Sequence, residues 1–220
     1  MKCVVTAGPT YEELDEVRRL TNFSTGTLGS GLADYLAGLG HEVELLIGYY
    51  STCPPAARAQ RQQAFTTSAD LRRRLAALAS PDVGAVFHVA AVSDFAFGKI
   101  WERTGTGELR EIKSAKISTR AEGLLAELKP TPKIIRELRG WFPKAFLAGW
   151  KYELEPETEG EAMARGADQI KESQTDVCVL NGRGFFNEGF GLLHKDMRLI
   201  RLPDREALFA ALGAAMKDRS

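Results

Sequence analysis

Short apolar runs alternate along this chain with segments whose apolar residues recur at helical spacing. Residues 3–6 form the first apolar run and predict a buried strand. A helix is predicted to open at residues 25–31, because Leu32, Tyr35, Leu36 and Leu39 would then share one face. The later runs that predict strands are residues 42–47, 63–67, 85–92, 145–150 and 176–180. Further helices are predicted from Thr67 or Ser68, from residue 131 and from residue 157.

Two segments depart from this alternation. Residues 95–130 carry glycines and scattered charges without a period, which predicts an extended flap or β-arm. Residues 190–202 predict a hairpin that turns at residues 194–196, and Asp204 is the predicted cap of a final helix. The pattern therefore favours an α/β fold: a three-layer, mostly parallel Rossmann-like sheet with a flexible arm at about 95–130 and a C-terminal hairpin plus helix. We expect one domain over residues 1–220.

The predicted parallel sheet also indicates where a ligand would bind. Right-handed crossovers bring the carboxyl ends of the strands to one edge of the sheet, and ligands of such folds bind in the crevice at that edge. We expect the loops that follow Val5, Val92, Gly149 and Leu180 to meet there. His88 lies inside the most apolar run and is interpreted as a hydrogen-bonded core histidine, not a ligand.

The charges balance, with 29 Lys plus Arg against 29 Asp plus Glu. A neutral chain has no net field to attract nucleic acid or an acidic membrane surface, so neither is an expected partner. Its apolar runs are too short for a membrane span, and Met1 leads directly into a strand without a signal peptide, so we expect a cytoplasmic protein. Cys3, Cys53 and Cys178 are odd in number and far apart, which favours reduced thiols over disulfides or structural zinc.

A segment rich in glycine and hydroxyl residues precedes the first predicted helix. Glycines allow the backbone to approach a phosphate, and the free N–H groups and dipole of a helix N-terminus attract its negative charge. The alternative interpretation is a turn whose glycines only permit close packing of helix on strand. The residues concerned are Ser24, Thr25, Gly26, Thr27, Gly29 and Gly31.

A dinucleotide site of an NAD(P)-dependent short-chain-type oxidoreductase is the less favoured interpretation of these glycines. That fingerprint needs a strand directly before the glycines, but residues 20–23 are short and polar. It also needs an acid near the end of the next strand to bind the ribose, and residues 48–50 contain none.

Several motifs, taken in order, resemble the phosphopantothenate–cysteine ligase family, which is the phosphopantothenoylcysteine synthetase or C-terminal domain family of the DNA/pantothenate metabolism flavoprotein. The likeness begins with the TAGPT turn at residues 6–10, the DEVR stretch at 15–18 and the NFSTG loop at 22–26. It continues with AAVSDF at 90–95, KIS at 116–118, LKPTPKI at 128–134, AGW at 148–150 and the strand at 176–181.

The resemblance implies a ligase of coenzyme A biosynthesis. In this family CTP or ATP, with Mg²⁺, activates the carboxylate of 4'-phosphopantothenate as an acyl-nucleotide and releases pyrophosphate. The amine of cysteine then displaces the nucleoside monophosphate and forms an amide. Family members are commonly homodimers, and the arm is the expected swapped or interface element. The decarboxylase of the pathway is expected on another chain.

The resemblance also implies the site residues. Asn22 matches the asparagine that holds the acyl-nucleotide, its amide donating to an acyl or phosphate oxygen, and Lys116 matches a lysine of the arm; these are the expected catalytic residues. No residue is expected to be a dedicated metal ligand. The expected nucleotide-binding residues are Gly8, Ser24, Thr25, Gly26, Gly29, Ala91, Asp94, Trp150 and Lys171.

Each of these positions also has a plainer interpretation, and the chain departs from the family at some of them. Asn22 and Asp94 taken alone would be caps or turn residues, and Lys116 an exposed cation. Lys133 replaces an aspartate of the family. The family has two lysines on the helix before residue 176, whereas here only Lys171 matches. A non-catalytic nucleotide-binding relative is therefore the alternative function.

Overall fold

The computed structural model describes the chain except for residues 114–116, 118–122, 153–157, 183–188 and 218–220. A sheet of eight strands forms its centre, in the order β13-β12-β11-β10-β6-β1-β4-β5. The strands from β11 to β5 pair in parallel, and the hairpin β12–β13 adds an antiparallel edge. The strands are β1 (Lys2–Ala7), β4 (Glu42–Gly48), β5 (Arg61–Phe65), β6 (Val83–His88), β10 (Phe146–Tyr152), β11 (Val177–Asn181), β12 (Phe190–His194) and β13 (Leu199–Leu202).

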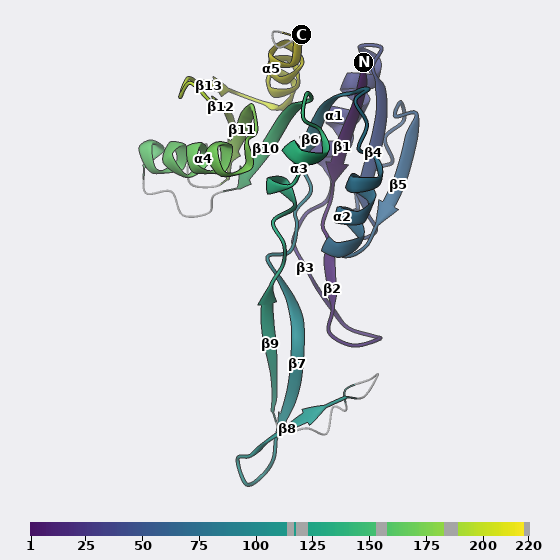
Figure 1. The fold of residues 1–220 in the computed structure, drawn as a ribbon, viewed down its shortest axis with the longest axis vertical. Coiled ribbons are helices and arrows are strands. Elements are labelled where there is room, and N and C mark those ends of the chain that lie inside the picture. Colours follow the sequence, from purple (N-terminus) through teal and green to yellow (C-terminus); the bar gives the residue numbers. More distant parts are fainter. Residues whose placement is uncertain (114–116, 118–122, 153–157, 183–188, 218–220) are drawn as a thin grey trace.

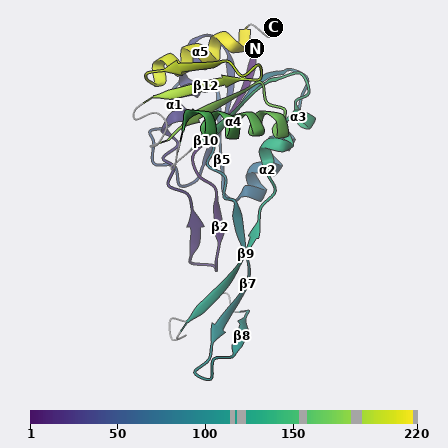
Figure 2. The same cartoon turned by 90° about the vertical axis from the view of Figure 1, so that its left-hand side faces the viewer.

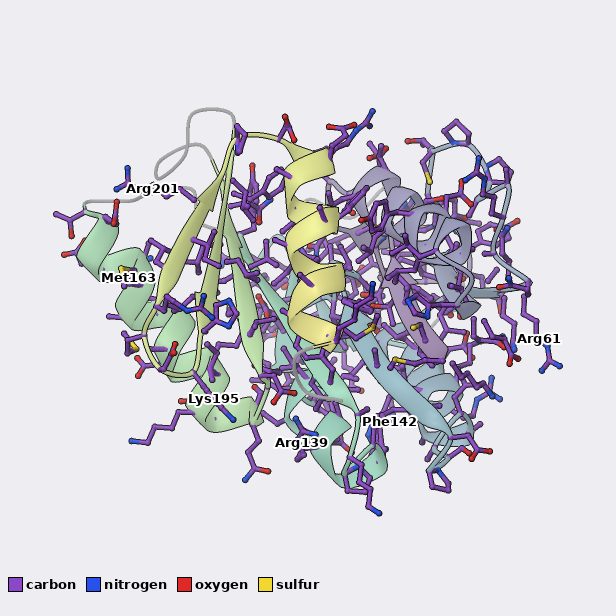
Figure 3. The ribbon with its side chains drawn as sticks, turned by 90° about the horizontal axis from the view of Figure 1, so that it is seen from above. Arg61, Arg139, Phe142, Met163, Lys195 and Arg201 are labelled. Atoms are coloured by element: carbon purple, nitrogen blue, oxygen red, sulfur yellow. The ribbon has the colours of Figure 1, made fainter. Side chains whose placement is uncertain are left out.

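Helices cover both faces of this sheet, as the two side views show (Figures 1 and 2). Alternate residues of each strand face opposite layers, so Val179 packs under α1 and α5, whereas Cys178 packs under α4. Seen from above, Arg61 of β5 and Arg201 of β13 mark the two edges of the sheet (Figure 3). One layer holds α1 (Thr27–Gly38) and α5 (Arg205–Lys217); the other holds α2 (Ser68–Ala77), η1 (Ile134–Arg136), α3 (Leu138–Trp141) and α4 (Glu159–Ser173).

Two small sheets lie outside the central one. The hairpin of β2 (Tyr11–Glu13) and β3 (Arg19–Thr21) follows β1. The arm consists of β7 (Phe95–Arg103), β8 (Leu109–Ile112) and β9 (Leu124–Pro130), and it extends away from the helices and the central sheet (Figure 1). The arm leaves the central sheet after β6 and returns at Pro130, so both of its ends lie at the carboxyl edge of the parallel strands.

The three-layer, mostly parallel sheet is confirmed, and so are the C-terminal hairpin and helix. Asp204 accepts a hydrogen bond from the N–H of Ala207 at 2.8 Å, and Thr67 caps α2 through the N–H of Asp70 at 3.1 Å. Both predicted caps are therefore correct, with Thr67 and not Ser68 as the cap of α2.

Two predictions of elements were wrong in detail, and one hairpin was not predicted. A continuous helix from residue 131 does not form; the chain makes η1 and the four-residue α3 instead. The prolines explain this, because each lacks an N–H and the residue before a proline favours extended backbone. The strand predicted over 85–92 ends at His88, since residues 89–94 turn toward the loop after β1. The hairpin β2–β3 was not predicted, because each strand is only three residues long and half of their residues are charged.

Candidate functional site

The loops after β1 and β6 are joined by backbone hydrogen bonds at the carboxyl edge of the sheet. Ala91 N–H donates to the carbonyl of Gly8 at 2.9 Å, and Thr10 N–H donates to the carbonyl of Ala91 at 3.1 Å. Pro9 and Ala91 form an isolated parallel bridge. Gly8 adopts a φ of 78°, which favours glycine. The predicted meeting of these two loops is thereby confirmed, and Gly8 and Ala91 are in direct contact.

A buried hydroxyl network fixes the same two loops to helix α2. Thr10 Oγ1 accepts a hydrogen bond from Ser93 N–H at 2.8 Å and donates to Ser93 Oγ at 3.1 Å. The hydroxyl of Ser68, in the first turn of α2, lies 3.3 Å from Thr10 Oγ1. All three side chains are buried. Each hydroxyl is common in turns, so nothing in the sequence indicated that these three residues would meet.

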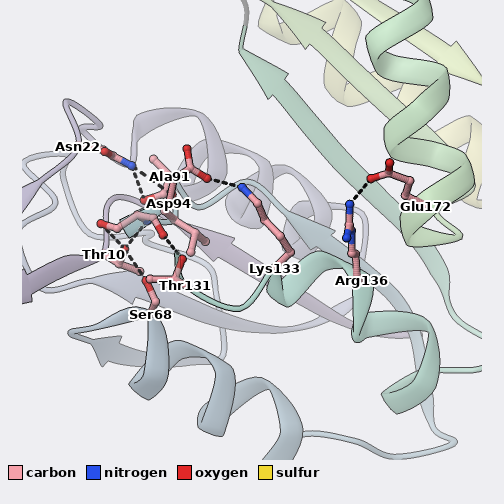
Figure 4. A network of polar contacts seen from close by, with 11 residues as sticks. Thr10, Asn22, Ser68, Ala91, Asp94, Thr131, Lys133, Arg136 and Glu172 are labelled. Atoms are coloured by element: carbon pink, nitrogen blue, oxygen red, sulfur yellow. Dashed lines mark hydrogen bonds and ion pairs between the residues drawn. The ribbon is translucent and has the colours of Figure 1, made fainter. Parts of the chain in front are cut away.

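Asn22 lies after β3 and contacts the segment that follows β6. Its amide Nδ2 donates to the carbonyls of Ala91 and Val92, each at 3.3 Å (Figure 4). In the structure, loop carbonyls receive both bonds, and the expected donation of this amide to a ligand oxygen stays a prediction. The side chain is exposed, and no described residue donates to its amide oxygen.

Asp94 is the exposed carboxylate at the start of the arm. Its backbone carbonyl accepts the N–H of Thr131 at 2.9 Å, and Thr131 Oγ1 donates to the carbonyl of Ser93 at 2.5 Å. Its side chain forms an ion pair with the ammonium of Lys133 (Figure 4). Thr131 and Lys133 thus fasten the two ends of the arm together. Asn22 lies beside them, because it contacts residues 91 and 92 of the same segment.

The glycine loop leads into α1, as predicted. Gly26 is the N-cap residue with a φ of 82° and no side-chain cap. Thr25 Oγ1 accepts a hydrogen bond from Thr27 N–H at 3.3 Å and lies 2.8 Å from Thr27 Oγ1. The exposed hydroxyls stand at a helix N-terminus, where N–H groups and the helix dipole favour an anion. Ser24 is half-buried, and its N–H donates to the carbonyl of Asn22 at 2.9 Å.

Two glycines of this loop face the protein and not the site. A Cβ on Gly29 would lie 2.7 Å from the Cβ of Ala7, and one on Gly31 would lie 3.4 Å from the ring of Phe209. The first distance is too short, so Gly29 allows α1 to pack closely on β1. The packing interpretation therefore holds for Gly29, whereas a Cβ on Gly31 would make only an ordinary van der Waals contact. The expected nucleotide contact of Gly29 stays a prediction.

Ser51 is a residue of the site that the sequence did not indicate. Its Oγ is buried between the two positive-φ glycines: a Cβ would lie 1.8 Å from it on Gly8 and 2.8 Å from it on Gly26. No described residue hydrogen-bonds to this hydroxyl. The next two residues donate their N–H groups to the carbonyl of Thr25 at 3.1 Å. The loop after β4 therefore holds the turn after β1 and the glycine loop together.

His88 supports the site from inside the sheet. Its Nδ1 lies 3.0 Å from Thr6 Oγ1, which also accepts the N–H of Ala90 at 3.1 Å. Burial lowers the pKa of His88 to about 4, so the ring is neutral at pH 7. The prediction of a hydrogen-bonded core histidine is confirmed.

The remaining predicted residues differ in place: Trp150 lies one residue beyond the pairing of Gly149 with His88, at the end of β6, whereas Lys171 is remote from these loops. Trp150, in β10, is half-buried and packs against the core under α1 and α5; its indole N–H is buried and no described residue accepts from it. Lys171 lies exposed in the last turn of α4. Because α4 leads back to the start of β11, Lys171 lies at the amino edge of the strands, opposite the glycine loop. Lys116 lies outside the described residues.

Within the described ranges, no three His, Cys, Asp or Glu side chains gather as metal ligands, and the cysteines form no disulfide. None of the described helices has the length and apolar character needed to cross a membrane. What the edge of the sheet offers is a helix N-terminus, hydroxyl groups, one amide and one ion pair. Such groups bind and orient phosphate and carboxylate oxygens.

The model of the DNA/pantothenate metabolism flavoprotein C-terminal domain family matches residues 1–211. The chain is 30% identical over 180 residues to the coenzyme A biosynthesis bifunctional protein CoaBC of Thermococcus kodakarensis, covering 82% of this chain and 41% of that protein. It is 31% identical over 189 residues to the Bacillus subtilis protein of the same name, covering 86% of this chain and 42% of the relative. The chain thus spans less than half the length of these curated relatives.

Solved structures share the whole fold. The crystal structure of the DNA/pantothenate metabolism flavoprotein from Streptococcus pneumoniae superposes with a TM-score of 0.86 at 25% identity and covers all of both chains. The family resemblance found in the motifs is therefore confirmed.

Proposed function

Because this chain belongs to the DNA/pantothenate metabolism flavoprotein C-terminal domain family, we propose that it is a nucleoside-triphosphate-dependent phosphopantothenate–cysteine ligase. The observation that supports this best is the convergence of Asn22, residues 91–94 and the N-terminus of α1 at one edge of the sheet. The similar CoaBC proteins carry coenzyme A biosynthesis in their names. The product would be an intermediate of that pathway, formed in the cytoplasm.

The reaction has two steps. A carboxylate oxygen of 4'-phosphopantothenate attacks the α-phosphorus of CTP or ATP, and pyrophosphate leaves as the acyl–phosphate bond forms. The amine of cysteine then attacks the acyl carbon; the nucleoside monophosphate leaves, and the amine loses a proton as the amide forms. Both steps need charge neutralisation and positioning more than acid–base catalysis. The hydroxyls of Thr25 and Thr27 and the N–H groups of α1 suit the phosphate groups.

Asn22 would hold the acyl-nucleotide next to the segment of residues 91–94. In the free protein its amide N–H groups are bound by the carbonyls of Ala91 and Val92. This orients the amide oxygen outward, where it can accept a hydrogen bond from the incoming amine of cysteine. Gly8 and Gly26 would shape the phosphate pocket, Trp150 would offer an aromatic surface to the nucleotide, and Lys116 would approach from the arm.

Mg²⁺ would enter with the triphosphate. This ion keeps several waters and commonly takes one or two carboxylates together with substrate phosphates. Among the described residues, Asp94 places an exposed carboxylate just after the end of β6. A carboxylate in this place suits a metal that is held mainly by the nucleotide, where it neutralises phosphate charge.

We further infer that the protein acts as a homodimer. The arm exposes large apolar side chains that a second copy could cover: Phe95, Leu109, Leu124, Leu125 and Leu128. Light scattering of the purified protein at micromolar concentration tests this directly, and a monomeric mass would reject it.

Pyrophosphate release tests the proposed function. Purified protein is incubated with Mg²⁺, phosphopantothenate and either CTP or ATP, with cysteine added last. We expect pyrophosphate only when nucleotide and phosphopantothenate are both present, and stoichiometric loss of cysteine afterwards. Asn22→Ala should lose most turnover, whereas Lys195→Ala, in the remote β12–β13 turn, should not. If neither nucleotide yields pyrophosphate although both bind, the chain is a non-catalytic relative.

A further inference from the structure

Within the described part of the chain, Lys133 is the cation that contacts residues 91–94, the segment that follows β6. Its ammonium forms an ion pair with Asp94, and Figure 4 shows Lys133 and Asn22 approaching residues 91–94 from different directions. The two hydrogen bonds from Thr131 to Ser93 and Asp94 anchor the backbone two residues before Lys133. The backbone that leads to Lys133 is therefore anchored beside residues 93 and 94.

The other cations around this region are differently engaged. Arg18 donates to Asp15 and to the carbonyl of Ile117. Arg136, one turn of η1 further on, forms an ion pair with Glu172 of α4 (Figure 4). Lys171 lies at the amino edge of the strands. Residues 91–94 thus have one cation in contact with them among the described side chains, and it is Lys133.

The ion pair of Lys133 with Asp94 is exposed and leaves N–H donors of the ammonium available. Lys133 is 55% exposed and Asp94 64% exposed. An ammonium has three N–H donors, and the carboxylate occupies one of them. An exposed pair of this kind adds little to folding stability. An unpaired carboxylate here would repel phosphate, whereas the pair is neutral and still presents two N–H donors.

From this geometry we propose that Lys133 binds a phosphate group of a bound substrate, with Asp94 holding its ammonium in place. The inference rests on the proposed function and names a further residue of the same site. The phosphate comes either from the nucleoside triphosphate or from phosphopantothenate, both of which are phosphoryl ligands. Cysteine carries no phosphate, so its binding serves as an internal reference.

Steady-state kinetics of four variants tests this. Lys133→Ala should raise the KM for one phosphate-bearing substrate about tenfold to a hundredfold, the usual loss for a charged hydrogen bond. The KM for cysteine should stay unchanged. Lys133→Arg should restore most of the affinity, and Lys133→Asp, which introduces the aspartate of the family, should lose the contact as alanine does. Lys129→Ala removes a comparably exposed lysine, paired with Glu127 on the arm, and should match wild type.

Calorimetry separates this inference from the proposed function. CTP, ATP and phosphopantothenate are each titrated into wild type and Lys133→Ala in the absence of turnover. Weaker binding of one of them by the variant supports the phosphate contact even if the protein makes no pyrophosphate. Equal binding, or equal KM values in an active enzyme, overturns it while leaving the ligase intact. Equal melting temperatures of the two proteins show that the variant is folded.

Discussion

Two aspartates of this chain each pair with a cation, yet their surroundings are opposite. The side chain of Asp15, in the β2–β3 hairpin, is 1% exposed, whereas that of Asp94, at the root of the arm, is 64% exposed. Asp15 accepts the N–H groups of Val17, Arg18 and Ile117 at 2.7 to 3.1 Å, and the Arg18 guanidinium at 2.8 Å. Asp94 has an ammonium beside it and open solvent around it.

The comparison separates a structural carboxylate from one that is available to a ligand. Burial alone would raise the pKa of Asp15, but the N–H groups of Ile117, Val17 and Arg18 and the Arg18 charge outweigh it and hold that pKa below its ordinary value. Asp15 thus joins the hairpin to the buried Ile117 and is saturated. Asp94 retains lone pairs for a metal or a donor. Polar groups whose hydrogen bonds are satisfied within the protein should therefore govern stability. Polar groups that remain exposed to solvent should govern function.

Removing the saturated carboxylate should have the largest effect. Asp15→Ala leaves the N–H groups of Val17, Arg18 and Ile117 without their acceptor and removes the Arg18 ion pair, so it should lower the urea midpoint more than any other variant discussed here. Asp15→Asn, which keeps one acceptor oxygen, should lie between alanine and wild type. Asp196→Ala removes an exposed aspartate from the β12–β13 turn and serves as the matched control. An unchanged midpoint for Asp15→Ala would contradict the structural role.

Lowering the pH should show how a second hydrogen-bonded group, His88, affects the free energy of unfolding. Its pKa is about 4 in the folded protein and about 6.5 in the unfolded chain, so below pH 6.5 the unfolded chain binds a proton that the folded one refuses. The free energy of unfolding should fall between pH 6.5 and 4, by at most about 3 kcal/mol from this group. Urea unfolding across this range measures it. His88→Asn should flatten the slope; equal slopes in both proteins would refute the assignment.

Removing the Thr10 hydroxyl should have the next largest effect on the free energy of unfolding. Thr10→Val keeps the shape but leaves the buried N–H of Ser93 without its acceptor, at a cost of about 1–3 kcal/mol. The exposed hydroxyl of Thr106, on the β7–β8 turn, offers the control: Thr106→Val should change the unfolding free energy by less than about 0.5 kcal/mol. Chemical denaturation of the two variants gives the comparison, and similar losses would contradict the buried network.

Asp94→Asn should have the smallest effect on stability and a large one on function. An exposed ion pair contributes little, so the unfolding free energy should change by less than about 0.5 kcal/mol. Under the proposed function, pyrophosphate release should nevertheless fall, because Lys133 loses the carboxylate that holds its ammonium. Asp15→Ala should therefore lower stability most, whereas Asp94→Asn should lower activity with little change in stability. A strongly destabilised Asp94→Asn protein would show that Asp94, too, is structural.

Much of the central domain could be predicted because its burial is periodic. The apolar runs at β1, β4, β6, β10 and β11 are flanked by turn residues, and amphipathic helices separate most of them, which is enough to indicate a parallel sheet. Gly26 and the loop before α1 could also be predicted, because a glycine at the start of a helix has a local conformational cause. The motifs of residues 6–26 and 90–95 then indicated the family.

The contacts that build the candidate site were not predictable in this way. Thr10 and Ser93 are 83 residues apart, and Lys133 and Asp94 are 39 apart. No periodicity connects such pairs, because their meeting depends on how the loops close at the edge of the sheet. Likewise, the direction of α4, and not the presence of a lysine, puts Lys171 at the amino edge.

The sequence by itself therefore determined the fold class, the family and the loop before α1, since local spacing and ordered motifs encode them. Only the tertiary structure decided that Gly29 serves packing, that Ser51 lies between two glycines and that Lys133 stands against Asp94. The physical reason is that hydrogen bonds and ion pairs between distant residues form after the hydrophobic core has set the positions of the chain. Their energies are small, and their partners carry no common pattern.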